Sequence, residues 1–173
     1  MTVRPARPED VEQIHSLVRE LAEYERAADE VASTPRQLSD ALFSPTPQVF
    51  CHVAESETSA GTSDGSLAGF ALWYVTYSTW TGRHGIWLED LFVRPAHRSC
   101  GHGRDLLAQL AAESVSRGYG RLEWWVLDWN HPTREFYASL GAVSMDEWTV
   151  NRLDGAALDE LARVGWSSRE GRA

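Results

Sequence analysis

The feature that most constrains this chain is a glycine-bearing segment near its middle, which joins an apolar strand to a helix. The strand-like run Ile86–Val93 leads into the string Arg98-Ser99-Cys100-Gly101-His102-Gly103-Arg104, and apolar residues then recur at helical spacing over Leu106–Val115. The first turn of a helix has N–H groups without intrahelical acceptors and lies at the positive end of the helix dipole, so it binds phosphate groups. Glycines let the backbone approach a pyrophosphate closely, and the two arginines add positive charge. The segment therefore predicts a pyrophosphate-binding loop.

Other interpretations of this segment fit the sequence less well. An ordinary turn between a strand and a helix would explain a lone G-x-G, but not the longer string R-x-x-G-x-G after an apolar strand. A dinucleotide-binding unit has G-x-G-x-x-G after its first strand and an acid about 20 residues further on. Here the third glycine is absent, and the segment follows several predicted strands. A Walker-type loop and Schiff-base chemistry both require Lys, and all sixteen basic residues are Arg.

Hydrophobic periodicity and turn signals predict the element order β-α-α-β-β-β-α-β-α-β, a mixed α/β (α+β) layer fold. At roughly 100–200 residues per domain, we expect a single domain over residues 1–165 and a frayed tail over 166–173. The expected elements are a strand at Met1–Ala6, helices at Pro8–Arg26 and Thr34–Phe43, a strand at Val49–Glu55, a mobile hairpin loop at Ser56–Ser66, strands at Leu67–Tyr77 and Ile86–Val93, a helix from Gly103, a strand at Leu122–Leu127, a helix at Thr133–Leu140, a strand at Trp148–Leu153 and a helix at Asp154–Val164.

Composition excludes several classes of protein. Sixteen basic and twenty-five acidic residues give a formal net charge of −9, which argues against a nucleic-acid partner and suits a cationic ligand. No apolar run approaches the roughly 20 residues that a membrane span needs. With only Cys51 and Cys100 and no signal-like segment after Met1, we expect a reducing, cytoplasmic location. The spacing of His97, Cys100 and His102 fits no standard zinc pattern, so no metal is expected.

The loop resembles the pyrophosphate-binding loop of the GNAT superfamily of N-acetyltransferases, which use acetyl-CoA. The predicted element order also matches that fold, a mostly antiparallel twisted sheet that splays around acetyl-CoA and is flanked by helices. Over about Val3–Leu153, the chain is similar in particular to the diamine acetyltransferases of the spermidine/spermine type. This resemblance rests on Arg4-Pro5-Ala6, Leu21–Glu25, Gly69–Tyr77 with Trp80 and Gly82, Trp87–Val93, Trp129-Asn130-x-Pro132, and Phe136-Tyr137 followed by Gly141-Ala142.

The resemblance implies a cofactor site. Leu91, Phe92 and Val93 would lie along the pantetheine, and their backbone N–H groups would polarise the thioester carbonyl. The segment Arg98–Arg104 would wrap the pyrophosphate, through Arg98, Ser99, Cys100, Gly101, His102, Gly103 and Arg104. Asn130 and Thr133 would also contact the cofactor, and Tyr137 would contact it and act as the general acid for the leaving thiolate.

The resemblance also implies an amine site. Glu89 would be the general base or bind the amine, with Asp90 nearby, and Tyr24 and Glu25 would line the amine channel. Trp80 is a candidate contact for the methylenes or the cation of the acceptor.

The chain departs from the family at this end. Ser78 stands where relatives carry an acid, an extra residue separates Trp80 from Glu89, and a deletion after Gly141 leaves Asp146 or Glu147 as the nearest acid. The reaction type is therefore better supported than the identity of the acceptor.

Two structural details bear on these roles. Strand alternation puts Trp87, Glu89 and Leu91 on one face and Leu88, Asp90 and Phe92 on the other, so Glu89 is either a cleft carboxylate or an acid at the edge of the sheet. Adjacent helical residues face different ways, which makes Phe136 the expected core residue and leaves Tyr137 for function.

We therefore expect an acetyl-CoA-dependent N-acetyltransferase in which a small cationic amine attacks the thioester directly, in a ternary complex. The acceptor is a diamine or polyamine; thialysine, another amino acid and an amine-bearing antibiotic stay open as alternatives. A non-catalytic sensor of acyl-CoA is a further alternative, but the presence of both Glu89 and Tyr137 favours an enzyme. The family resemblance implies a homodimer.

Overall fold

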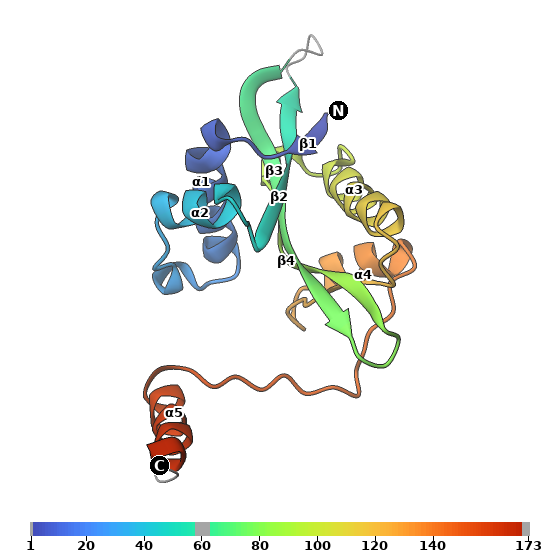
Figure 1. Cartoon of the computed structure of the whole chain (residues 1–173). Coiled ribbons are helices and arrows are strands. Elements are labelled where there is room, and N and C mark those ends of the chain that lie inside the picture. Colours follow the sequence, from blue (N-terminus) through green and yellow to red (C-terminus); the bar gives the residue numbers. More distant parts are fainter. Residues whose placement is uncertain (1, 58–62, 171–173) are drawn as a thin grey trace. The chain divides into compact units, whose positions relative to one another are not determined.

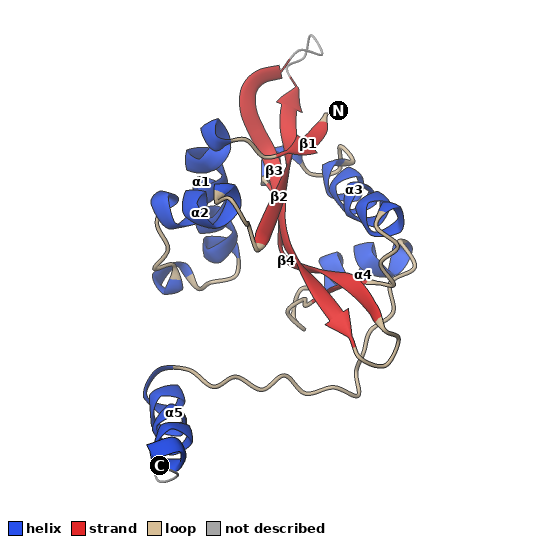
Figure 2. Cartoon of the chain, in the orientation of Figure 1, coloured by secondary structure: helices blue, strands red, loops and turns tan. Residues whose placement is uncertain are grey.

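The computed structural model describes residues 2–57 and 63–170, and the chain divides into two compact units, residues 1–125 and 126–173. The first unit has an open sheet with helices on both faces (Figures 1 and 2). Its described strands lie in the order β1-β2-β3-β4-β5; neighbours are antiparallel except for β4 and β5, which are parallel. This confirms the predicted mixed α/β class. The strands are β1 (Val3–Pro5), β2 (Val49–Glu57), β3 (Ser63–Ser78), β4 (Arg83–Val93) and β5 (Leu122–Trp124).

Helices cover the two faces of this sheet unequally. α1 (Val11–Tyr24) and α2 (Pro35–Phe43) lie on one face, and α3 (His102–Ser116) lies on the other (Figure 1). Short 3-10 turns precede α1 (η1, Pro8–Asp10), follow it (η2, Ala28–Glu30) and follow β4 (η3, Pro95–His97). The core under α1 and α2 forms because apolar residues repeat at helical spacing in the helices and at alternate positions in the strands, for example Ile14, Leu17, Val53, Phe70 and Phe92.

Local sequence signals set where the helices begin. The predicted capping box at the start of α2 is confirmed, because the Gln37 N–H donates to the Thr34 Oγ1 at 3.3 Å and the Thr34 N–H donates to the Gln37 Oε1 at 2.9 Å. α3 begins directly after Gly101, whose φ of +91° is readily adopted only by glycine.

A bulge in β4 changes which side chains share a face. Asp90 lies opposite Leu72 and Leu88 lies opposite Trp73, so Glu89 is an extra residue without a partner in β3. Directly opposed residues project to the same face of a sheet. The alternation predicted for Trp87–Phe92 is therefore wrong: Trp87 shares the α1 face with Asp90 and Phe92, and Leu88 shares the α3 face with Leu91.

β4 has an open edge beyond this bulge. Among the described residues, β5 pairs only with Ile86, Trp87 and Leu88, so no strand flanks that edge from Glu89 onward. On the β3 side, the Arg94 N–H donates to the Ala68 carbonyl oxygen at 2.9 Å. Antiparallel pairing alternates along a strand, so the N–H groups of Leu91 and Val93 face the open edge.

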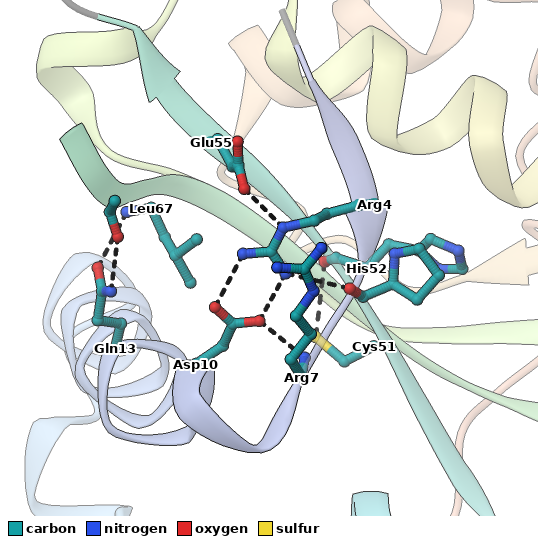
Figure 3. A network of polar contacts seen from close by, with 10 residues as sticks. Arg4, Arg7, Asp10, Gln13, Cys51, His52, Glu55 and Leu67 are labelled. Atoms are coloured by element: carbon teal, nitrogen blue, oxygen red, sulfur yellow. Dashed lines mark hydrogen bonds and ion pairs between the residues drawn. The ribbon is translucent and has the colours of Figure 1, made fainter. Parts of the chain in front are cut away.

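An ion network fixes the start of the first unit (Figure 3). Arg4 donates from Nη1 and Nη2 to the two carboxylate oxygens of Asp10, at 2.7 and 3.0 Å, and from Nε to Glu55 at 2.6 Å. The Arg7 N–H donates to the same Asp10 carboxylate at 2.7 Å. The Arg4 guanidinium in β1 therefore binds two carboxylates, Asp10 in η1 and Glu55 in β2, and holds these three elements together.

The second unit contains α4 (His131–Ser139) and α5 (Gly155–Glu170). The strand predicted at Trp148–Leu153 is wrong, because no described strand pairs with this segment and the side chains of Trp148, Val150 and Leu153 are exposed. Alternating apolar residues make a strand only where a neighbour accepts its backbone hydrogen bonds. The helix expected to end at Val164 continues to Glu170, since one glycine costs a helix only about 1 kcal/mol. Among the described residues, no helix has both the length and the hydropathy that crossing a membrane requires.

Two other predicted boundaries also differ. Most of the predicted loop Ser56–Ser66 is strand: β2 runs to Glu57 and β3 begins at Ser63, with these two residues opposite each other, while residues 58–62 lie outside the described part. Backbone pairing to a neighbouring strand outweighs the weak strand propensity of these polar residues. The strand expected at Leu122–Leu127 ends at Trp124, where its pairing with β4 ends.

Candidate active site

The loop between β4 and α3 is shaped to receive an anion. Ser99 has φ of +62° and Gly101 has φ of +91°, so the backbone takes the left-handed conformation at two positions just before the first turn of α3. Residues 98–101 are exposed, and the N–H groups of the first helical turn lack intrahelical acceptors. This cradle and the positive end of the α3 dipole fit a pyrophosphate. His102 is the exception among the predicted contacts, because its side chain is buried beside the ring of His97.

The open edge of β4 leads toward this loop. Leu91, Phe92 and Val93 are the last residues of β4. The N–H groups of Leu91 and Val93 point to the edge of β4 that β5 does not cover. An extended group with amide functions, such as pantetheine, can add to such an edge as a further strand would. Phe92 instead faces the core under α1 with its side chain.

Arg98 and Arg104 differ in their surroundings. The Arg98 Nε donates to the Val93 carbonyl oxygen at 3.0 Å, and its guanidinium lies over the Tyr24 ring, 4.7 Å from the centroid. Arg98 thus holds the loop against the end of α1 as well as adding charge. Arg104 is exposed in the first turn of α3.

Three carboxylates lie near the β4 bulge without a recorded arginine partner in the described chain: Glu25, Glu89 and Asp90. Desolvation, followed by the charges of Glu89 and Glu25, raises the pKa of Asp90 from its usual 3.8 to about 6. Partial desolvation also raises the pKa of Glu25 at the end of α1. Glu89 is exposed and accepts a hydrogen bond from the Trp87 Nε1 at 3.0 Å. A half-buried carboxyl that titrates near neutrality is a common property of functional sites.

Aromatic rings border these acids. The Trp87 ring lies 6.4 Å from the Tyr74 ring and meets the Trp125 ring edge to face at 4.9 Å. Neither Tyr74 nor Trp125 was predicted as a site residue from the sequence. Trp125 could not have been found by local pattern, because it joins this group only through the parallel pairing of β5 with β4.

Among the described ring contacts, none joins Trp80 to this aromatic group. Its side chain is 88% exposed on the turn between β3 and β4. The nearby Ser78 is buried and its Oγ accepts a hydrogen bond from the Thr81 N–H at 3.3 Å. Ser78 therefore stabilises the turn.

The remaining predicted residues belong to the second unit. Asn130 precedes α4 and is 6% exposed, Thr133 is half-buried in the first turn, and Tyr137 is 8% exposed. Phe136, expected to be the better buried of the adjacent pair, is only half-buried. Asp146 is exposed in the segment between α4 and α5. Within the described ranges, no group of three His, Cys, Asp or Glu side chains is placed to hold a metal ion.

Comparison with known proteins agrees with this geometry. Residues 13–142 match the acetyltransferase (GNAT) family. The thialysine N-epsilon-acetyltransferase of Bos taurus is 38% identical over 164 residues, which covers 92% of this chain and 96% of the relative. A spermidine/spermine N(1)-acetyltransferase-like protein of Homo sapiens is 29% identical over 95% of this chain and 24% of its own length. An integron cassette protein from the mobile metagenome of V. cholerae has the same fold, with a TM-score of 0.73, 22% identity and coverage of 93% and 96% of the two chains.

The predicted resemblance is thereby confirmed in its sequence and in its fold. GNAT enzymes use acetyl-CoA, and the loop before α3 and the open edge of β4 fit its pyrophosphate and pantetheine. The chain belongs to the GNAT family and is an N-acetyltransferase related to the thialysine and spermidine/spermine-type enzymes.

Proposed function

We propose that this enzyme acetylates a primary amine of a small, cationic acceptor such as thialysine or a diamine, by direct attack in a ternary complex with acetyl-CoA. The observation that carries this proposal is the group of acids Glu25, Glu89 and Asp90 beside the open edge of β4, without an arginine partner among the described residues. Such a group attracts ammonium ions and disfavours anionic acceptors.

The attacking amine must first lose a proton, because an alkylammonium has a pKa of about 10. We assign Asp90 as the proton acceptor, either directly or through a water. Its pKa of about 6 leaves it ionised at neutral pH and makes it a stronger base than an ordinary aspartate. Glu89, the base that the sequence predicted, is exposed and engaged by the Trp87 indole, which suits binding of the ammonium form.

The cofactor supplies the acetyl thioester, and the chain supplies the groups around it. The Leu91 and Val93 N–H groups at the open edge of β4 are donors for the pantetheine amides and for the thioester oxygen. We assign the pyrophosphate to the backbone from Ser99 to Arg104. The family resemblance implies Asn130 and Thr133 as further contacts of the cofactor. Tyr137 has the chemistry to protonate the departing thiolate, since a phenol can donate a proton at neutral pH.

The test is a steady-state assay of CoA release with purified protein, acetyl-CoA and a panel of acceptors. The panel holds thialysine, putrescine, butylamine, an N-terminal peptide and the anionic amine taurine. We expect a higher kcat/KM for the small cationic amines thialysine, putrescine and butylamine than for the peptide or taurine, and initial rates in which both substrates must bind before CoA leaves. Preference for taurine or for the peptide would contradict the proposed acceptor, and a ping-pong pattern would contradict the ternary complex.

A further inference from the structure

The aromatic group beside the β4 bulge has a feature that the acetylation step does not use. Trp87 lies opposite Glu123 in the parallel pairing of β4 and β5, so Trp125, two residues further along, projects to the same face. The two indoles meet at 83°, with 4.9 Å between their ring centroids. In an edge-to-face pair, the ring that presents its edge keeps both of its own faces clear of its partner. Trp125 is 61% exposed, so this pair is open to solvent.

The charges near this pair favour a cation. Glu89 accepts a hydrogen bond from the Trp87 Nε1 at 3.0 Å, which places a carboxylate at the rim of the indole. Glu123 lies on the same face, and its Oε2 is 2.7 Å from the Nε of Arg121. The positive charge of Arg121 is therefore already paired with a carboxylate. Tyr74 adds a further ring at 6.4 Å from Trp87. Tryptophan is the aromatic side chain that binds cations best, and a nearby carboxylate adds to the attraction.

The register of the sheet sets how far this pair lies from the proposed proton acceptor. Asp90 faces Leu72 and Trp87 faces Tyr74, which are two residues apart on β3. At about 3.4 Å per residue, the two positions on β4 are about 7 Å apart along the sheet. The nitrogens of an extended four- or five-carbon diamine are separated by about 6–8 Å, given carbon–carbon bonds of about 1.5 Å.

We propose that Trp87 and Trp125 determine acceptor specificity by binding a second cationic group of the acceptor, while the amine to be acetylated lies at Asp90. The indoles hold the distal ammonium and the adjoining methylenes, and Glu89 orients Trp87 and contributes negative charge. This inference rests on the proposed function, and it adds the length and the second charge of the acceptor. Acceptors with one amine, or with two amines too close together, bind only at Asp90.

The experiment compares diamines with monoamines of equal length in wild-type protein and in variants. The acceptors are putrescine, cadaverine, butylamine, pentylamine and ethylenediamine, and the readout is the ratio of kcat/KM for each diamine to that for its monoamine. Trp125→Leu removes an exposed ring, and Trp87→Phe keeps a ring but removes the donor to Glu89. Tyr77→Leu is the matched control, since Tyr77 is a 57% exposed aromatic on the α3 face of the same sheet.

We expect wild-type protein to prefer putrescine or cadaverine over the matched monoamine and over ethylenediamine. Trp125→Leu should lower the diamine-to-monoamine ratio by about three- to thirty-fold, the usual range for a cation–π contact, through the diamine KM. Trp87→Phe should lower it less, and Tyr77→Leu should leave it unchanged. Thermal unfolding of each variant checks that the fold is intact.

Several results would overturn this inference while the proposed function stands. They are acetylation of amines without a diamine preference in wild-type protein, an unchanged ratio in both Trp variants, or an equal loss toward diamines and monoamines. Failure of wild-type protein to acetylate any amine of the panel would instead contradict the proposed function itself.

Discussion

Two groups of acids in the first unit show opposite electrostatics. Asp10 and Glu55 share the guanidinium of Arg4, and Asp10 also accepts from the Arg7 N–H (Figure 3). Burial alone would raise the pKa of Asp10, but the hydrogen bonds from Arg4 and Arg7 hold it below its usual value. Near the β4 bulge, burial raises the pKa of Asp90, and the neighbouring charges of Glu89 and Glu25 add to this rise rather than offset it, which brings the pKa to about 6.

We infer that this difference separates an acid with a structural role from an acid with a role in binding. At the start of the fold, each buried carboxylate has its counter-ion within the chain, so the network stabilises the native state and has no charge left for a ligand. Near β4, the repulsion among the acids is relieved only when a cation arrives. We infer that this second group is kept at a cost in stability because the acceptor is the missing counter-ion.

The largest expected effect is on turnover. Asp90→Asn keeps the shape of the side chain and removes the proton acceptor, so kcat should fall about 10²–10⁴-fold, the usual size of an acid–base contribution. Asp10→Asn is the matched control, since it makes the same change in the paired group and should leave kcat within about two-fold. Steady-state rates of CoA release measure both. Near-wild-type turnover in Asp90→Asn, with chemistry shown to be rate-limiting, would remove Asp90 as the base and return that role to Glu89.

A buried residue of the second unit, Tyr137, allows a similar test of a structural against a functional role, because its side chain carries a titratable hydroxyl. Tyr137→Phe keeps the packing of the ring and removes only the O–H donor. If this group protonates the thiolate, whose pKa is about 8.5, kcat should fall about 10²–10³-fold with little change in acetyl-CoA affinity. Phe136→Leu, at the half-buried neighbour, is the control for packing. Equal losses in the two variants would indicate a structural role for Tyr137.

The third effect concerns a pair of glycines at the two ends of α3. Gly101 at its start has φ of +91° and Gly118 after its end has φ of +68°, so alanine is strained at both positions. Only Gly101 lies in the proposed pyrophosphate loop. Gly101→Ala should raise the KM for acetyl-CoA about ten-fold or more, whereas Gly118→Ala should lower stability by about 1 kcal/mol without changing that KM. Calorimetric CoA affinity that is unchanged in Gly101→Ala would contradict the loop assignment.

The sequence predicted those parts that depend on neighbours along the chain. The capping box of Thr34 and Gln37, the helix that follows the Gly101 and Gly103 segment and the buried run of β3 each follow from residues a few positions apart, although α3 begins at His102, one residue before the predicted Gly103. The bulge at Glu89 could not be predicted in this way, because it depends on the register between β3 and β4.

Long-range pairing also explains what was missed. Trp125 contacts Trp87 only because β5, which follows α3 in the chain, pairs with β4. No local sequence pattern predicts this pairing. The segment Trp148–Leu153 has the alternation of a strand but no described partner, so its pattern alone was misleading. Residue types thus predicted the family and its reaction class better than the register of the sheet.

The smallest effect is on stability, and its sign should differ between the two groups of acids. The pKa of Asp90 is higher in the native state than the usual 3.8, so its contribution to the free energy of unfolding falls as the pH rises from about 4 to about 6. Asp10 has a lowered native pKa, so its contribution is present above about pH 4 and is lost as the pH falls through that lowered value.

At neutral pH, Asp90→Asn should therefore raise the free energy of unfolding, by roughly 1–2 kcal/mol after solvent screening of a half-buried group. Asp10→Asn should lower it by about 2–3 kcal/mol, because it leaves the Arg4 charge without its main partner. Urea unfolding at a series of pH values measures both. The gain in Asp90→Asn should disappear below about pH 4, where the aspartate is protonated in both the folded and the unfolded chain. A gain that persists there would mean that packing rather than charge separates the two groups, and the acceptor would then not be the counter-ion that the acids near β4 lack.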